Sequence, residues 1–195
     1  MGTRVFHQTG ELAYERPLKN GLTHGIVYRC DIPGKVLSAE PCVNGLRHGI
    51  ARQYNDQEEL LGSYSMKRGT GLDLWWGEYD GKRVLYETRY FKDGILHGFE
   101  WWLAGDTKRI WRERHFWKGK GHGIERSWNF EGRLRRGFTR YWIEGRRVTK
   151  RRYVRESSKD PALPKFRDSD NRPQRKLPPE VMASLGELVR RSRAG

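Results

Sequence analysis

A glycine recurs every 24 or 25 residues along most of this chain, and this period constrains the fold more than any other feature of the sequence. The glycines of this series are Gly21, Gly45, Gly69, Gly94 and Gly119. Four of them open the motif Gly-x-x-His-Gly, whose copies comprise Gly21, His24 and Gly25; Gly45, His48 and Gly49; Gly94, His97 and Gly98; and Gly119, His122 and Gly123. The third copy, 69–73, is degenerate. A fixed period of this length is typical of proteins built by repeating one supersecondary unit.

A second series of turn residues lies between the motifs. Its members are Gly10, Gly34, Gly81, Gly105 and Gly132, with Asn55 and Asp56 near the missing position. Because Gly, Asn and Asp reach positive φ most readily, both series are typical of turns. The segments between turns span 6–11 residues and are often β-branched or aromatic, as in 82–91, which favours strands over helices. Each repeat is therefore expected to supply two strands and two turns to an antiparallel sheet.

Two apolar columns keep the same register as the glycines. Three residues before the motif glycines stand Leu18, Cys42, Met66, Phe91 and Phe116, and nine before them stand Leu12, Val36, Leu60, Leu85 and Ile110. The alignment of two glycine columns with two apolar columns indicates a true internal repeat.

Both faces of a representative strand, 107–117, mix apolar and charged residues. With strict alternation, one face carries Ile110, Arg112, Arg114 and Phe116, and the other carries Trp111, Glu113, His115 and Trp117. A strand of a two-sheet sandwich would have one apolar and one polar face. The sequence therefore predicts an all-β fold, an elongated single-layer antiparallel β-meander of repeated hairpins, wetted on both sides and stabilised by cross-strand aromatic pairs.

The composition changes after Tyr153, which predicts three parts. Residues 1–153 are expected to form the repeat sheet, with about five to six repeats of 24–25 residues. Residues 154–177 are polar, contain proline and show no period, as a linker does. Residues 178–195 favour a short amphipathic helix, because apolar side chains recur at helical spacing from Val181 to Val189. A helix this short is marginal alone, so we expect it to dock on the sheet or on its open end.

Enzyme, metal and membrane signals are weak or missing in the sequence. The motifs of phosphate loops, nucleophile elbows and zinc proteases are absent, so we expect neither catalysis nor a cofactor. Cys30 and Cys42 are too few for a disulfide framework or a four-ligand metal site, and a reducing cytoplasm is the expected location. Either cysteine beside a histidine is the remaining catalytic alternative, although Cys42 belongs to an apolar column. No apolar run reaches the roughly 20 residues of a membrane helix, and no signal peptide is evident.

The histidine column is expected to be structural. Equivalent turns lie two strands apart, roughly 10 Å, whereas ligands of one zinc ion all lie within ~2.1 Å of it. His24, His48, His97 and His122 are therefore expected to hold turn geometry by hydrogen bonding. Surface recognition, sensitive to pH near neutrality, is the alternative.

The motif and its neighbours resemble the MORN-variant repeat of bacterial proteins called YwqK-type antitoxins. The pattern is Gly-x-x-His-Gly, an aromatic strand, Gly-Lys-x-Leu, a second strand, an aromatic residue and Asn/Asp-Gly, and the clearest copies are 20–25, 44–49 and 93–98. The resemblance covers roughly residues 5–153. It implies an elongated antiparallel sheet without catalysis, and a toxin-neutralising or scaffolding role.

Positive charge is concentrated late in the repeats. The chain carries a net charge of +15, and residues 106–153 hold 16 Lys and Arg against 5 Asp and Glu. The candidate binding surface interleaves these cations with aromatic rings and comprises Trp111, Arg112, Arg114, Trp117, Arg126, Trp128, Arg140, Tyr141, Trp142 and Arg147. Three interpretations stay open: arginines that cover tryptophans of a thin sheet, an acidic protein partner, and nucleic acid or anionic lipid.

The sequence favours a non-enzymatic repeat scaffold that binds a protein partner along its sheet, with an antitoxin-like role. The Trp- and Arg-rich last repeats are its expected energetic centre, because these residue types are enriched at interface hot spots. The alternative is a binder of nucleic acid or an anionic lipid surface that acts through residues 106–153.

Overall fold

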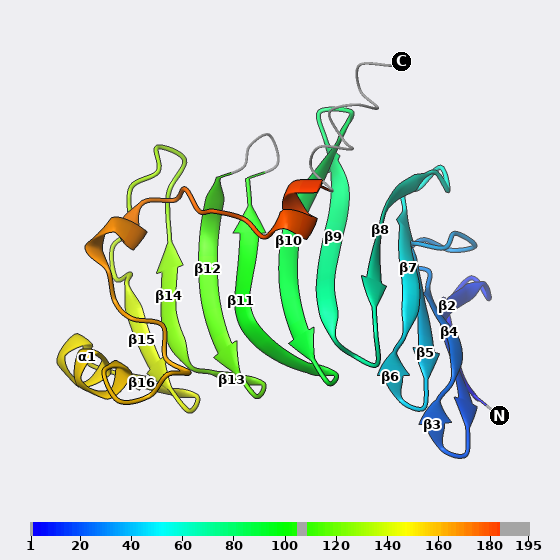
Figure 1. The fold of residues 1–195 in the computed structure, drawn as a ribbon. Coiled ribbons are helices and arrows are strands. Elements are labelled where there is room, and N and C mark those ends of the chain that lie inside the picture. Colours follow the sequence, from blue (N-terminus) through cyan, green and yellow to red (C-terminus); the bar gives the residue numbers. More distant parts are fainter. Residues whose placement is uncertain (1, 105–108, 184–195) are drawn as a thin grey trace. The chain divides into compact units, whose positions relative to one another are not determined.

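The computed structural model describes residues 2–104 and 109–183, and antiparallel strands make up most of this part of the chain. The strands form two open sheets, in the orders β1-β2-β4-β5-β7-β8 and β9-β10-β11-β12-β14-β15-β16. Short strands β3, β6 and β13 pair with β2, β5 and β12. Strands adjacent in the chain are thus adjacent in each sheet (Figure 1). The prediction of an all-β antiparallel fold built from hairpins is confirmed.

The strands of the first sheet are short. They are β1 (Gly2–Phe6), β2 (Leu12–Lys19), β3 (Leu22–Thr23), β4 (Gly25–Arg29), β5 (Ser38–Val43), β6 (Leu46–Arg47), β7 (Gly49–Tyr54) and β8 (Leu60–Met66). The motif histidines His24 and His48 interrupt the pairs β3/β4 and β6/β7, so one expected strand is divided into two pieces in each repeat.

The second sheet contains longer strands. They are β9 (Gly71–Tyr79), β10 (Lys82–Lys92), β11 (Ile95–Leu103), β12 (Ile110–Trp117), β13 (Lys120–Gly121), β14 (Gly123–Ser127), β15 (Arg140–Ile143) and β16 (Arg146–Val148). Helix α1 (Lys150–Ser157) follows the last strand, and a single 3-10 turn, η1 (Asp168–Asn171), comes later. The chain divides into two compact units, residues 1–83 with 91–94, and residues 84–90 with 95–195.

Most hairpins close through two-residue turns in which both residues have positive φ. Asn20 and Gly21 have φ of 52° and 77°, and Lys118 and Gly119 have φ of 49° and 78°. Such turns match the right-handed twist of antiparallel strands, and they favour Asn or Asp followed by Gly. At the missing position of the second turn series, Glu58 has a φ of 63°, and the Asn55 side chain accepts hydrogen bonds from the N–H groups of residues 57 and 59. Glycine periodicity in the sequence therefore reports this turn geometry directly.

A β-bulge in β12 corrects the predicted assignment of faces. The register pairs Trp102 with Arg112 and Leu103 with Ile110, which leaves Trp111 as the extra residue. A bulge places two successive residues of one strand opposite one residue of its partner and breaks the alternation. The Trp111 ring lies 6.2 Å from the Trp102 ring, on the face that also carries Arg112. Strict alternation wrongly placed Trp111 with Glu113 and Ile110 with Arg112.

The chain after the last strand covers part of one face of the second sheet. Tyr153 of α1 is fully buried in a cluster with Ile124, Tyr141 and Leu163. Further along, Pro173 accepts a hydrogen bond from the Ile110 N–H at 3.1 Å. This segment, orange to red in Figure 1, crosses β14, β12 and β11. The structure here differs from a sheet wetted on both sides, because apolar side chains spaced along the tail bury themselves on the sheet.

The segment expected to be a linker contains the end of α1, the turn η1 and buried Leu163 and Leu177. Polar composition and prolines had indicated an unstructured connection, whereas its few apolar side chains find cover on the sheet. Residues 179–183 are helical and Val181 is fully buried. The remainder of the helix expected over 178–195 lies outside the described residues.

Candidate binding surface

Glu113 organises the covered face of the second unit. It is 1% exposed and accepts hydrogen bonds from Arg126 at 2.7 Å, Arg175 at 2.9 Å and the Trp101 indole at 2.9 Å. Two guanidinium groups and one indole thus satisfy a carboxylate that could not otherwise be buried. Arg175 comes from the C-terminal segment, so this network fixes that segment to the sheet.

Three of the predicted surface residues lie beneath this cover. Trp128 is 1% exposed, its indole donates to the Asn171 carbonyl at 2.6 Å, and the Arg175 guanidinium lies 5.2 Å from its ring. Arg126 and Tyr141 are also buried. These side chains stabilise the unit and are not part of an open surface. Sequence reasoning placed them there because the tail was treated as a linker.

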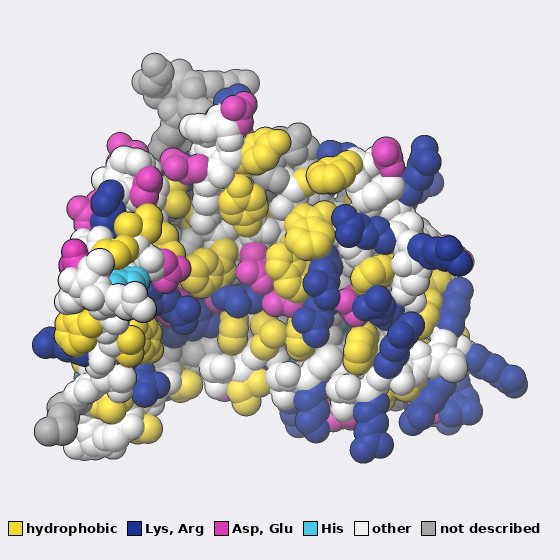
Figure 2. Space-filling view, turned by 180° about the vertical axis from the view of Figure 1, so that it is seen from behind, with side chains coloured by type: hydrophobic (Ala, Val, Ile, Leu, Met, Phe, Trp, Pro, Cys, Tyr) yellow, Lys and Arg dark blue, Asp and Glu magenta, His cyan; other side chains and the backbone are white. Residues whose placement is uncertain are grey.

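The opposite face of the second unit carries an exposed cluster of rings and guanidinium groups. Trp111 is 38% exposed, and the Arg112 guanidinium lies 5.1 Å from the ring of Trp102. Arg114 lies 4.7 Å from the Phe116 ring. We call this side the open face, because the C-terminal segment lies on the other side. Figure 2 views the molecule from this side and shows Lys and Arg interleaved with hydrophobic side chains.

Buried glutamates hold the cations of the open face. Glu125 accepts from Arg112 at 2.8 Å and from the Trp142 indole at 3.0 Å, and its side chain is 4% exposed. The Arg112 guanidinium and the Trp142 indole are thereby each held in one orientation, and the side of each group that faces away from Glu125 stays accessible to a ligand. Such pre-organisation lowers the entropic cost of engaging a ligand.

A second glutamate on this face has an unusual acidity. Burial, together with the neighbouring Glu87, raises the pKa of Glu100 to about 7, whereas Arg114 and Arg89 oppose the shift. Arg114 lies 3.9 Å from the Glu100 carboxylate. The cause is physical, because two carboxylates at one partly dry site cannot both ionise freely.

Trp117 belongs to the covered side of β12, beyond the reach of the tail contacts described above. Its ring centroid lies 4.3 Å from that of His97, and it is half-buried. The predicted surface residues therefore divide into three groups. Trp111, Arg112, Arg114 and Trp142 share the open face, and strand pairing places Arg140 and Arg147 on the same face as Trp142; Trp117 lies on the other side, and Arg126, Trp128 and Tyr141 are buried.

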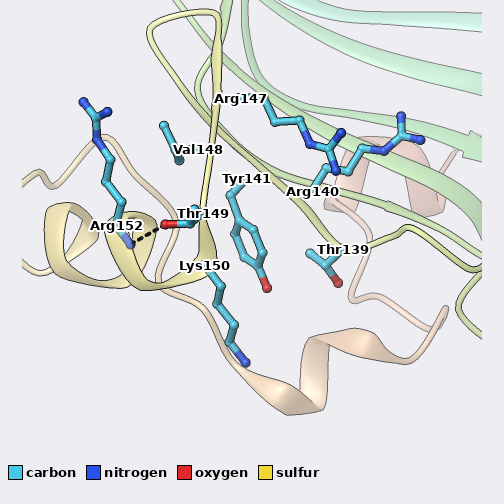
Figure 3. Close-up of a pocket in the computed structure, with 8 residues that line it drawn as sticks. All are labelled: Thr139, Arg140, Tyr141, Arg147, Val148, Thr149, Lys150 and Arg152. Carbon is cyan, nitrogen blue, oxygen red and sulfur yellow. Dashed lines mark hydrogen bonds between the residues drawn. The ribbon is translucent and has the colours of Figure 1, made fainter.

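Arg140 and Arg147 lie at the end of the sheet, where a pocket of about 630 Å³ opens between β15, β16 and α1. Its lining residues are Thr139, Arg140, Tyr141, Arg147, Val148, Thr149, Lys150 and Arg152 (Figure 3). We call this the end pocket. The Thr149 hydroxyl caps α1 by accepting from the Arg152 N–H at 3.3 Å.

The motif histidines link each turn to the next one along the edge of the sheets. The backbone N–H before the following motif glycine donates to histidine Nδ1, from Asn44 to His24 at 3.5 Å, from Arg68 to His48 at 3.1 Å and from Glu144 to His122 at 3.1 Å. In the degenerate third copy the Thr70 hydroxyl accepts from the Asp93 N–H at 3.0 Å instead. An accepting Nδ1 requires a neutral ring with its proton on Nε2. The arrangement gives His24, His48 and His122 a structural role at these turns.

Potential ligands for a metal are spread out. Across residues 2–104 and 109–183, no three His, Cys, Asp or Glu side chains are grouped so that they could hold an ion. Cys30 and Cys42 are free thiols, and burial raises the pKa of both. No helix within the described residues is long and apolar enough to cross a membrane.

Comparison with known proteins adds no relative. No family model, no curated protein and no solved structure matches this chain.

Sequence reasoning missed several residues of the open face and the end pocket, namely Trp102, Glu100, Glu125 and Thr149, whereas Lys150 and Arg152 belong to the basic stretch 106–153 that it singled out. For two of them a signal was present. Glu100 and Glu125 follow His97 and His122 by three residues each, whereas the equivalent positions of earlier repeats hold Val27 and Ala51. A change from apolar to acidic at one repeat position indicates that this position has acquired charged partners in the later repeats.

Proposed function

We propose that this chain is a MORN-variant repeat protein that binds a protein partner without catalysis, on an elongated single-layer meander of hairpins. The docking surface is the open face of the second unit, and its central residues are Trp111, Arg112, Arg114 and Trp142. The observation that carries this proposal is the exposed Trp111, which the bulge turns towards Trp102 and Arg112. Trp and Arg are the residue types that most often dominate binding energy in interfaces.

The expected partner presents an acidic surface. Glu100 and Glu125 are almost fully buried and already paired, so the exposed charge of this face comes mainly from its arginines. The excess of cations over residues 106–153 adds to the positive potential. Complementary charge speeds encounter and excludes partners of the wrong sign. The resemblance to YwqK-type antitoxins suggests a toxin that this chain neutralises in the cytoplasm.

The test compares a double variant, Trp111→Ala with Trp142→Ala, with a matched control, Phe130→Ala. Phe130 is 89% exposed on a turn of the same unit. Its replacement by alanine removes an aromatic ring that lies away from the open face. Each immobilised protein is used for quantitative affinity capture from the source cells at about 0.1 and 0.5 M salt. We expect specific partners to be retained by wild type and Phe130→Ala at both salt concentrations and lost by the double variant, because hot-spot truncations cost roughly 2 kcal/mol or more each.

Equal capture by all three proteins, with folding intact, would remove the open face from consideration. Binding of DNA, RNA or anionic vesicles by wild type at low salt, with steep loss at high salt, would instead favour the anionic-surface alternative, because counterion release makes such binding salt-dependent.

A further inference from the structure

The arginines of the end pocket differ from the arginines of the second unit that pair with buried glutamates. Arg112, Arg126 and Arg175 each pair with a buried glutamate at 2.9 Å or less. In contrast, Arg140 and Arg147 form no ion pair with any carboxylate of the described residues. Like charges held close together without compensation are unfavourable, so this arrangement calls for an anion.

The topology forces these two arginines together. In the β15–β16 hairpin, Trp142 pairs with Arg147 and Tyr141 pairs with Val148, so Arg140 and Arg147 are diagonal neighbours on one face. Figure 3 shows their side chains extending side by side. Arg140 is also held by its Nε donating to the Gly137 carbonyl at 3.2 Å and by the Phe138 ring at 4.2 Å. Two adjacent guanidinium groups offer a fork of donors suited to phosphate oxygens.

The remaining lining adds donors and positive potential. Tyr141 projects from the opposite face of β15 to Arg140 and packs in the buried cluster, and Figure 3 shows its hydroxyl pointing towards the space between Thr139 and Lys150. The Thr149 hydroxyl accepts from a backbone N–H and retains its own hydrogen as a donor. The first turn of α1 contains no acidic residue and begins with Lys150, whose ammonium lies 4.0 Å from the Phe166 ring. Asp168 acts on the Tyr141 hydroxyl from the opposite side and limits the positive potential there.

We propose that the end pocket binds a phosphate group between Arg140 and Arg147 on one face of the β15–β16 hairpin, with the Thr149 hydroxyl as a further donor and Lys150 adding positive potential from the other face. The volume of about 630 Å³ admits more than a bare phosphate ion, so a small phosphomonoester is the expected class of ligand. Arg140 and Arg147 lie on the same face as Trp142, so the site adjoins the open face, but phosphate binding there requires no protein partner.

The chain offers matched controls for every cation that the test removes. Arg146 and Arg147 are sequence neighbours, both exposed, but only Arg147 lines the end pocket. Lys150 and Arg151 are likewise adjacent and exposed, and only Lys150 lines it. Arg147→Gln and Lys150→Gln therefore lose the same net charge as the controls Arg146→Gln and Arg151→Gln.

Binding of inorganic phosphate and of glycerol 3-phosphate is measured for the full chain by titration calorimetry, at constant ionic strength set with chloride. We expect both ligands to bind wild type, glycerol 3-phosphate more tightly, with about tenfold weaker binding in Arg147→Gln, because each charge-assisted hydrogen bond contributes on that order. Lys150→Gln should weaken binding less, and the two controls should match wild type. Thermal unfolding in chloride alone verifies that all variants are folded.

Two results would overturn the proposal. One is the absence of heat for both ligands with folded wild type. The other is an equal loss of affinity in Arg146→Gln and Arg147→Gln, which would mean that phosphate responds to net charge alone. Tighter binding of inorganic phosphate than of glycerol 3-phosphate would support the site but assign it to the free ion.

Discussion

At the scale of single residues, backbone conformation at the turns explains most of the repeat. The residue before Gly21, Gly45, Gly69, Gly81, Gly94, Gly119 and Gly145 has positive φ, which costs most side chains roughly 1–2 kcal/mol and costs Asn and Asp less. Asn20 and Asn44 meet this requirement, whereas Lys118 adopts the same conformation at a φ of 49°. The turns at Arg68, Lys118 and Glu144 therefore keep the geometry with less suitable residues than the turns at Asp80 and Asp93.

Replacing Lys118 with asparagine should stabilise the protein. Lys118 is exposed, so the change affects few contacts beyond the backbone preference. We expect Lys118→Asn to raise the free energy of unfolding by about 0.5–1 kcal/mol and the melting temperature by roughly 2–4 °C. The control Lys118→Gln removes the same charge without the conformational gain. Equal melting temperatures for the two variants would show that positive φ at this turn carries no measurable strain.

At the scale of elements, the C-terminal segment and the second sheet stabilise each other. Glu113 on β12, Arg126 on β14 and Arg175 on the tail form one buried group. The segment also supplies Asn171 to the Trp128 indole. A tail that satisfies buried polar groups is part of the unit and leaves only the opposite face for a partner.

Loss of Arg175 should loosen the tail. Arg175→Ala leaves Arg126 as the remaining guanidinium partner of Glu113, so we expect a loss of about 1–3 kcal/mol and a tail that opens more often. Hydrogen exchange should then be faster at the Ile110 N–H, which donates to Pro173. Lys176→Ala serves as the control, because Lys176 is exposed and is the next residue in the chain. Unchanged exchange at Ile110 in Arg175→Ala would show that the tail is held by its apolar contacts alone.

At the scale of the whole molecule, the raised pKa of Glu100 predicts an unusual pH dependence of stability. The folded state holds a proton on Glu100 up to about pH 7, whereas an unfolded chain releases it near pH 4.5. The folded state thus binds more protons between these values, and the free energy of unfolding falls as pH rises through this window. The free energy of unfolding should fall by at most about 1.4 kcal/mol per pH unit in this window. The charged groups that face Glu100 are Glu87, Arg89 and Arg114.

Urea unfolding at pH 5, 6, 7 and 8 measures this slope. We expect Glu100→Gln to flatten it and to be more stable than wild type at pH 8, because the amide has no charge to desolvate. Glu58→Gln, at an exposed turn, should leave the slope unchanged. If wild type and Glu100→Gln showed parallel profiles, Glu100 would not be the titrating group.

The strands, the hairpins and the positions of the turns could be predicted from residue order alone. These features are local, because the positive φ at a two-residue turn depends only on the two residues of that turn. Gly21 and Gly119 therefore favour a turn whichever strands they join. The same local logic extends to the antiparallel order, since two-residue turns can join only adjacent antiparallel strands.

Which side chains are exposed on the open face depends on contacts between parts of the chain that are distant in sequence. The face of Trp111 depends on a bulge set by pairing with the neighbouring strand, and the burial of Trp128 depends on a segment more than 40 residues later in the chain. The end pocket likewise requires β15, β16 and α1 to meet. The register of β12, the covering of Trp128 by the C-terminal segment and the shape of the end pocket all arise from contacts between residues distant in the sequence. The spacing of residues along one strand contains no information about such contacts.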